Sequence, residues 1–251
     1  MACELLQCGA LLALASIASA ASEPALPATP PDRDPIRWEH PAGLVTSNTL
    51  DEIRSKLSTQ ARARRVYEAR RAEVERWVQV PSEKLRAVFP RQRGNVYHNF
   101  SCPADRSRLV FDPFQCESFV CPSCGKHYAP GVDSGVYGAG DRYHGTLYDG
   151  WVCLFYEMAG GIAEGLGVMA AVDPNPPAAY ARRGVEILML YADTIEGLKT
   201  KKDPNPVMNV LLTYHREGDS TVLFDLACAY EVLRRHMSPE QRSRFEKVVL
   251  Q

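Results

Sequence analysis

The sequence predicts a mainly α-helical protein, built from antiparallel helix pairs, that carries a small metal-binding β-hairpin. Apolar residues recur at helical spacing over most of the chain after residue 48. Helix-start signals and proline-containing turns divide that pattern into separate helices. Four cysteines lie close together, at residues 102–124, where the helical pattern is interrupted.

The composition is that of a globular protein with little net charge. The 251 residues carry a formal net charge of -1, and 45% of them are hydrophobic. This length allows one or two domains with a sizeable core. The near-neutral charge argues against a nucleic-acid partner, and we expect no membrane span, since no apolar run is long enough.

The first twenty residues have the order of a secretory signal peptide. A short apolar core at residues 11–17 precedes Ala18-Ser19-Ala20, a small-residue cleavage site. Residues 21–48 follow as a proline-rich linker. We therefore expect a signal peptide at residues 1–20 and export to the periplasm or the medium. An apolar N-terminal tail is the alternative, because the segment begins without Lys or Arg.

Residues 49–251 are expected to form the helical domain. Its first helix begins at the capping box Thr49-x-x-Glu52, and apolar side chains repeat up to Val78. The opposite face carries more basic than acidic side chains. Such a face is typical of a solvated helix, and contact with an acidic polysaccharide is the functional alternative. A short helix follows between Pro81 and Pro90.

Residues 95–130 are expected to form a zinc-ribbon-like insert. They contain two near-copies of one tetrapeptide, Cys102-Pro103-Ala104-Asp105 and Cys121-Pro122-Ser123-Cys124. In a zinc ribbon each Cys-x-x-Cys turn supplies two thiolates to a tetrahedral metal ion. Gly125 gives the second turn the backbone freedom that it needs. We expect a small β-hairpin held by a structural zinc ion.

Three ligands follow from the motif and the fourth stays open. Cys102, Cys121 and Cys124 supply thiolates, whereas Asp105 fits the fourth place by position and Cys116 by chemistry. Two histidines close in sequence, His98 and His127, are further alternatives. Because export favours oxidation, disulfides Cys102–Cys116 or Cys121–Cys124 compete with metal binding. Two further cysteines, Cys153 and Cys228, lie within apolar helical patterns and are expected to be inert core residues.

After a glycine-rich loop at residues 131–145, the chain is helical. The most apolar helix spans residues 147–172 and is expected to be buried all round, with Asp149 at its capped start. Gly160, Gly161, Gly165 and Gly167 indicate that another helix packs closely against it. It pairs with a helix at residues 177–196. A second pair spans residues 220–236 and 239–251, and Ser238-Pro239-Glu240-Gln241 begins its last helix.

The catalytic candidates are two neighbouring Tyr/His pairs. Tyr143 and His144 form one pair, and Tyr214 and His215 form the other. Both residue types are suited to proton transfer, although solvated histidines and packed tyrosines are the structural alternative. For Tyr148 the sequence leaves two alternatives, a place in the wall of a cleft or a place in the core.

Several segments together resemble the heparinase II/III-like polysaccharide lyases. The similarity runs in order through residues 38–251. The segments that carry it are His98-Asn99-Phe100-Ser101-Cys102-Pro103, Leu109-Val110-Phe111-Asp112-Pro113, Cys121-Pro122-Ser123-Cys124-Gly125-Lys126-His127-Tyr128, Tyr148-Asp149-Gly150-Trp151, and the helix at residues 185–193.

The resemblance implies a partial (α/α) toroid and a polysaccharide partner. Such proteins have an N-terminal α/α toroid followed by a β-sandwich, and they cleave uronic-acid-containing polysaccharides by β-elimination. No residue of this chain matches the family's catalytic Asn/His pair and Tyr. We therefore expect an N-terminal segment of such a lyase, truncated before the catalytic residues. The alternative is a non-catalytic, exported, zinc-stapled helical domain that binds carbohydrate or is purely structural.

Overall fold

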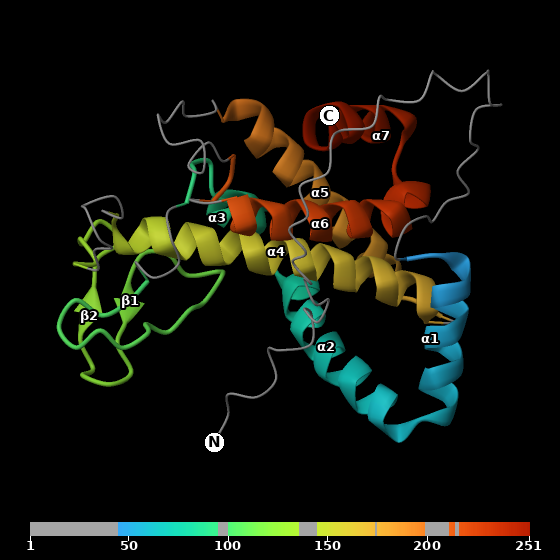
Figure 1. Cartoon of the computed structure of the whole chain (residues 1–251), viewed down its shortest axis with the longest axis horizontal. Helices are drawn as coiled ribbons and strands as arrows, with labels where there is room; N and C mark the ends of the chain where they lie inside the picture. Colours follow the sequence, from blue (N-terminus) through green and yellow to red (C-terminus); the bar gives the residue numbers. More distant parts are fainter. Residues whose placement is uncertain (1–44, 95–99, 136–144, 174, 199–210, 214–215) are drawn as a thin grey trace, which may run out of the picture. The chain divides into compact units, whose positions relative to one another are not determined.

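Helix α4 (Leu147–Val172) is the central element of the fold, and α1, α2, α5 and α6 all contact it (Figure 1). The computed structural model describes residues 45–94, 100–135, 145–173, 175–198, 211–213 and 216–251. All of them belong to the unit Trp38–Gln251. The expected signal peptide and nearly all of the expected linker lie outside the described residues.

The described part of the chain is mainly α-helical, as the sequence predicts. Its α-helices are α1 (Ser47–Thr59), α2 (Ala61–Gln79), α3 (Ser82–Val88), α4, α5 (Ala178–Gly197), α6 (Arg216–Leu233) and α7 (Pro239–Phe245). A 3-10 turn, η3 (Arg234–His236), and a π-helical turn, η4 (Glu246–Leu250), flank α7. Strands β1 (Phe119–Val120) and β2 (His127–Tyr128) form an antiparallel two-stranded sheet.

Helix α4 is buried because other helices cover most of its surface. Trp151, Phe155 and Leu166 are among its fully buried side chains. Gly165 lets α2 approach closely, since a Cβ there would lie 3.1 Å from the Cγ1 atom of Val74. The chain between α4 and α5 is short, and α5 runs back across α4 (Figure 1). These contacts confirm that the glycines of α4 mark close helix packing.

Helix α4 also has the length and composition of a membrane-spanning segment. Among the described helices it alone meets that description, and 61% of its most apolar window is buried inside the fold. Length and hydropathy do not separate a span from a core helix. The packing of α5 and α6 on α4 makes it the core helix of this unit.

The structure differs from the predicted helix from residue 49 to Val78 in two respects, of which the first is a division at Gln60. The Ser58 and Thr59 hydroxyls both donate to the Ser55 carbonyl oxygen, each at 2.8 Å. Such bonds compete with the helical ladder and favour a helix end. Helix α1 also begins earlier than predicted, with Thr46 as its N-cap. Thr49 therefore lies inside the helix, where its amide donates to the Thr46 hydroxyl, and the predicted capping box with Glu52 does not start the helix.

Most of the later helix starts agree with the sequence, whereas the helices expected at residues 220–236 and 239–251 end as α-helices at Leu233 and Phe245 and continue as a 3-10 turn and a π-helical turn. Asp149 completes a capping box with Thr146 at the start of α4, and Gln241 does so with Ser238 at the start of α7. Helix α6, however, begins at Arg216 and not at Ser220. Acidic residues in its first turn favour this earlier start, because they lie at the positive end of the helix dipole.

Candidate metal centre

The insert between α3 and α4 is fixed to the helical body by aromatic packing. Trp151 of α4 donates its indole N–H to the Asp112 carbonyl oxygen at 2.9 Å. Phe114 packs edge-on against Trp77 of α2, with ring centroids 4.9 Å apart. Phe100, at the start of the insert, is buried in the same core. The insert, drawn in green in Figure 1, therefore extends the core beside the first turns of α4.

Two turns of the insert have the same backbone geometry. In the first knuckle (residues 102–107), the Arg106 amide donates to the Cys102 carbonyl at 2.8 Å. In the second knuckle (residues 121–126), the Gly125 amide donates to the Cys121 carbonyl at 2.9 Å. Arg106 has φ 64° and Gly125 has φ 70°, so both turns use the left-handed region at the same place.

Antiparallel pairing closes both knuckles at the same register. Ser101 and Arg108 form a bridge across the first knuckle, and Val120 pairs with His127 across the second. The cysteine amide that begins each knuckle donates to the residue five positions later, at 2.7 Å in the first and 2.9 Å in the second. Asp105 therefore occupies the place in the first knuckle that Cys124 occupies in the second.

The two knuckles bring four ligand-type side chains together. The ligand atoms of Cys102, Asp105, Cys121 and Cys124, here called the metal cluster, all lie within 4.8 Å of one another. The sulfurs of Cys102 and Cys124 are 3.7 Å apart. Cys121 Sγ lies 3.5 Å from an oxygen of Asp105.

These separations fit a tetrahedral metal ion. With Zn–S bonds of about 2.3 Å and Zn–O bonds of about 2.0 Å, two sulfurs lie about 3.8 Å apart, and a sulfur and an oxygen about 3.5 Å apart. The Cys102–Cys124 sulfur separation is far above the roughly 2.05 Å of a disulfide bond. All the cysteines of the described chain are free thiols. The cluster could therefore hold a metal ion.

Polar neighbours orient the cluster and favour ionised ligands. The Ser107 hydroxyl donates to Asp105 at 2.6 Å and lies 3.0 Å from Cys121 Sγ. This hydroxyl, with the Ser107 amide, holds the pKa of Asp105 well below its usual range. Burial raises the pKa of Cys121, but hydrogen bonds from Ser107 and the Cys124 amide outweigh burial and lower that pKa to about 7. Thiolates and carboxylates are the forms that bind metal.

Tyr128 is a further partner of the cluster that the sequence did not single out. Its hydroxyl lies 3.1 Å from Cys102 Sγ. The hydrogen bond to Cys102 raises the pKa of Tyr128, which keeps the phenol protonated as a donor. The contact of Ser107 with the cluster could have been predicted from the repeated tetrapeptide. Ser107 accepts the backbone bond that closes the first knuckle, as Lys126 does in the second. Tyr128 had no such signal.

The structure separates the fourth-ligand candidates. Asp105 belongs to the metal cluster, whereas Cys116 and His127 are described but lie outside it. Cys116 packs as a half-buried side chain against the core, and burial raises the pKa of its thiol. His98 lies outside the described residues. Position in the repeat, and not thiol chemistry, therefore selects the fourth side chain.

The two cysteines that the sequence places in apolar helices lie in the helical core. Cys153 of α4 and Cys228 of α6 are both buried. Burial, with the nearby carboxylates Glu164 and Asp225, raises the pKa of Cys228 to about 11. A protonated, buried thiol has little reactivity, in keeping with a packing role.

The catalytic candidates are not placed. Tyr143, His144, Tyr214 and His215 all lie outside the described residues. Tyr148 is described and stacks on Trp151, with ring centroids 5.5 Å apart. Burial raises the pKa of Tyr148, so its hydroxyl is not activated for proton abstraction. The Asp149 carboxylate accepts from the amide and the hydroxyl of Thr146, as a helix cap does.

The chain matches no protein-family model, no curated protein and no solved structure.

Proposed function

We propose that the metal cluster binds one zinc ion and that this ion is structural. Three thiolates favour zinc over magnesium or calcium, which prefer oxygen ligands. Four protein ligands fill a tetrahedral site and leave no position for a water or substrate. The single observation that carries this proposal is that two matching knuckles bring four ligand atoms within 4.8 Å of one another, with two separations that fit a tetrahedral site.

The proposed ion would join the two halves of a zinc-ribbon-like insert. Each knuckle closes on itself through its own backbone bonds, and one backbone bond between Val110 and Val120 links their flanking segments. An ion shared by both knuckles would hold them together and would keep Phe100 and Phe119 in the core. Loss of metal would then unfold the insert before the helices.

Metal content of the purified full chain tests this proposal. We expect about one zinc per chain by elemental analysis, and a large loss in Cys121→Ser and Cys124→Ser. Cys116→Ser is the matched control, since Cys116 lies outside the metal cluster, and it should keep its zinc. A chain purified without chelators that contains no zinc, and binds none when zinc is added, would refute the proposal.

We further propose that this helical domain belongs to a heparinase II/III-like lyase that acts on uronic-acid-containing polysaccharide. The motifs quoted above and the mainly α-helical fold support it. Exposed basic side chains of α2 add support, because Arg62, Arg64 and Arg65 form no ion pair with a described residue. Such charges suit an anionic polymer.

The proposed reaction is β-elimination at a uronic acid. A neutralising group must bind the carboxylate so that the C5 proton becomes acidic, a base removes that proton, and an acid protonates the leaving oxygen. No described residue is assigned to these steps. Tyr143, His144, Tyr214 and His215 stay candidates for proton transfer.

Binding and turnover assays separate the lyase from a non-catalytic domain. We expect residues 1–251 to bind acidic polysaccharide without forming unsaturated uronate products, which absorb in the ultraviolet. Robust turnover would place the catalytic residues within this chain and would contradict the expectation that it lacks them. The second candidate function is that of an exported, zinc-stapled domain that binds carbohydrate or is purely structural. A stop codon directly after Gln251 in the gene, together with saccharide binding by the chain alone, would favour it.

A further inference from the structure

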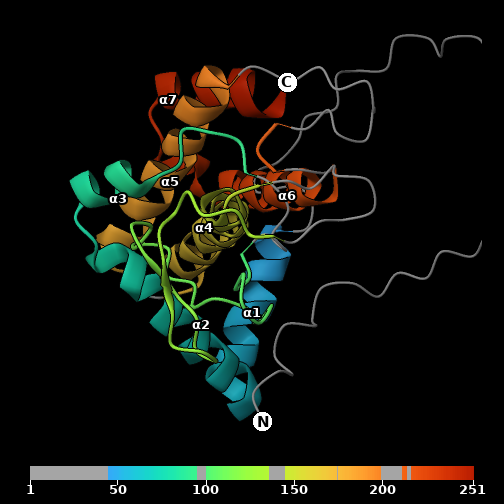
Figure 2. The ribbon, with the colours of Figure 1, turned by 90° about the vertical axis from the view of Figure 1, so that its left-hand side faces the viewer.

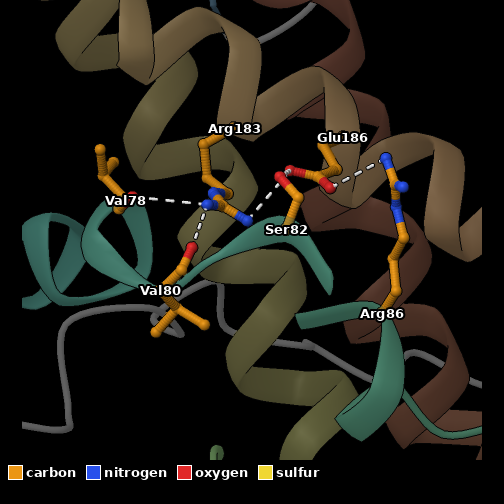
Figure 3. A network of polar contacts seen from close by, with 6 residues as sticks. All are labelled: Val78, Val80, Ser82, Arg86, Arg183 and Glu186. Carbon is orange, nitrogen blue, oxygen red and sulfur yellow. Dashed lines mark hydrogen bonds and ion pairs between the residues drawn. The ribbon is translucent and has the colours of Figure 1, made fainter. Parts of the chain in front are cut away.

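A groove of about 1010 Å³ lies beside α5, but its buried charges are already paired within the chain. Figure 2 shows α3 and α7 on either side of α5. Glu186 of α5 lies 3.0 Å from Nη1 of Arg183 and 3.4 Å from Nη2 of Arg86 (Figure 3). It also accepts from the Ser82 hydroxyl at 2.9 Å, and Arg183 donates to the Val80 carbonyl oxygen. This network fixes α3 on α5 and leaves none of its three charged side chains for a ligand.

The metal cluster differs from the groove, because one of its reactive groups faces solvent. Cys124 is exposed, whereas Cys102 and Cys121 are fully buried. Metal binding requires thiolates, and the susceptibility of a cysteine to oxidation follows its thiolate character and its exposure. An oxidant in solution therefore reaches the sulfur of Cys124 first.

The sulfur of Cys102 is close enough to react with an oxidised Cys124. The two Sγ atoms are 3.7 Å apart and belong to different knuckles. A disulfide bond needs about 2.05 Å, so the two sulfurs would have to approach by about 1.7 Å. A bond between them would link the two knuckles directly.

Cys121 is the less suitable partner, because its sulfur is held within its own knuckle. Its Sγ atom accepts from the Cys124 amide at 3.3 Å and lies 3.0 Å from the Ser107 hydroxyl. A Cys121–Cys124 bond would disturb that contact with the backbone. The contact of Cys102 Sγ with the Tyr128 hydroxyl, at 3.1 Å, involves no backbone atom of either knuckle.

We propose that the metal cluster is a redox switch, in which a peroxide joins Cys102 to Cys124 and the metal ion is released. The inference rests on the zinc centre proposed above and adds its regulation. The Cys124 thiolate attacks hydrogen peroxide, the O–O bond breaks, hydroxide leaves, and the sulfur becomes a sulfenic acid. The Cys102 thiolate then attacks that sulfur, so that the S–S bond forms and a second hydroxide leaves. Two thiolates are oxidised, and one peroxide is reduced to two hydroxides.

Oxidation leaves Asp105 and Cys121 as the ligands of the cluster. Two protein ligands are too few for a structural tetrahedral site. The disulfide replaces the ion as the link between the knuckles, so the insert stays joined while the metal is lost. Removal of the metal by a chelator supplies no such link and should unfold the insert.

Peroxide titration of the zinc-loaded full chain tests the switch, with a chromophoric zinc indicator and peptide mapping as readouts. We expect about one zinc released per disulfide, a peptide linked through Cys102 and Cys124, and recovery of both on addition of a phosphine reductant and zinc. Zinc retained at peroxide concentrations that oxidise the metal-free chain would overturn the switch. Zinc release with a Cys121–Cys124 bond, or with no disulfide, would also overturn it. A chain that never binds zinc would refute the zinc centre, and the switch with it.

Cys124→Asp gives the second knuckle the ligand set of the first and removes the exposed thiol. It should bind zinc and keep it at peroxide concentrations that empty the unchanged chain. Cys116→Ser is the matched control, since this thiol lies outside the metal cluster, and it should release zinc like the unchanged chain. Equal release from Cys124→Asp, or zinc retained by Cys116→Ser, would overturn the assigned pair. If Cys124→Asp binds no zinc, the peptide map of the unchanged chain still decides.

Discussion

The Oδ1 atom of Asp219 accepts both polar hydrogens of Thr213, from the amide at 2.7 Å and from the hydroxyl at 2.8 Å. The same carboxylate accepts from the amides of Leu211 and Leu212. Asp219 is 8% exposed and lies in the first turn of α6. One buried carboxylate therefore fixes three successive residues, directly before Tyr214 and His215.

Removal of this anchor should destabilise the protein. We expect Asp219→Asn to lower the free energy of unfolding by about 1–3 kcal/mol, because an amide nitrogen would face a backbone donor. Thr213→Val, which removes only the hydroxyl, should cost about 1 kcal/mol. Urea titration measures both. Asp51→Asn, at an exposed ion pair with Arg54, is the control and should change stability by less than about 1 kcal/mol.

Substitution of Asp105 should change metal affinity in two directions. Asp105→Cys completes a four-thiolate site at the place that Cys124 holds in the second knuckle, so zinc should bind more tightly. Asp105→Ala removes a ligand and should weaken binding by more than the roughly 10–100-fold that loss of an outer partner costs. Competition with a chromophoric chelator measures both affinities.

The exposed Glu117 supplies the control for Asp105. Glu117→Ala removes a nearby carboxylate that lies outside the metal cluster, and its zinc affinity should equal that of the unchanged chain. Unaltered affinity in Asp105→Ala would show that the fourth ligand is another group.

Gly94 should not tolerate a side chain. A Cβ atom there would lie 2.7 Å from the backbone nitrogen of Cys153 and 3.0 Å from its Cα atom, and a helix backbone cannot move aside locally. Gly94→Ala should therefore lower the free energy of unfolding by about 1–3 kcal/mol. Gly131→Ala is the matched control, since no atom lies within 4 Å of its Cβ position, and melting temperatures should separate the two variants clearly.

Asp225 should make stability fall as the pH rises through mildly acidic values. Burial, together with the nearby Glu164 and Glu157, raises its pKa from 3.8 to about 6, although Arg70 opposes them. Between pH about 4 and about 6 the folded state therefore binds more protons than the unfolded state, so the free energy of unfolding decreases with pH. Partial exposure reduces the expected loss to about 1–2 kcal/mol.

Asp225→Asn should remove this loss, because the amide stays neutral throughout. Urea titrations at pH 4 and pH 7 should show a smaller fall in stability than in the unchanged chain. The exposed Glu83→Gln is the control and should keep the full fall. If Asp225→Asn and the unchanged chain lose the same stability over this range, the buried carboxylate is not the cause.

Several features of the fold could be read from local sequence. Ser238-Pro239-Glu240-Gln241 begins α7 as predicted, because a capping box acts within four residues. The division between α1 and α2 at Gln60 was not predicted, because no proline or glycine marks it in the sequence. It is instead accompanied by hydrogen bonds from the Ser58 and Thr59 hydroxyls to one backbone carbonyl. The start of α6 was also missed, although the acidic residues of its first turn are a local signal.

The residues of the candidate sites also divide into those that local sequence predicts and those that only the folded chain brings together. Cys102, Cys121 and Cys124 could be chosen from their spacing, and Asp105 was one of several options until both knuckles were seen to share one geometry. The groove beside α5 gave no sequence signal at all. Arg183 and Glu186 are neighbours on one helix, but Ser82 and Val80 reach them from more than 100 residues away.

The sequence by itself determined the helical periodicity, the helix caps and the pair of knuckles, because these depend on residues within a few positions of one another. Only the tertiary structure decided which side chain joins the three thiols, how α4 is buried, and where Glu186 meets its partners. Those outcomes depend on side chains that are distant in the chain and become neighbours only when the helices pack.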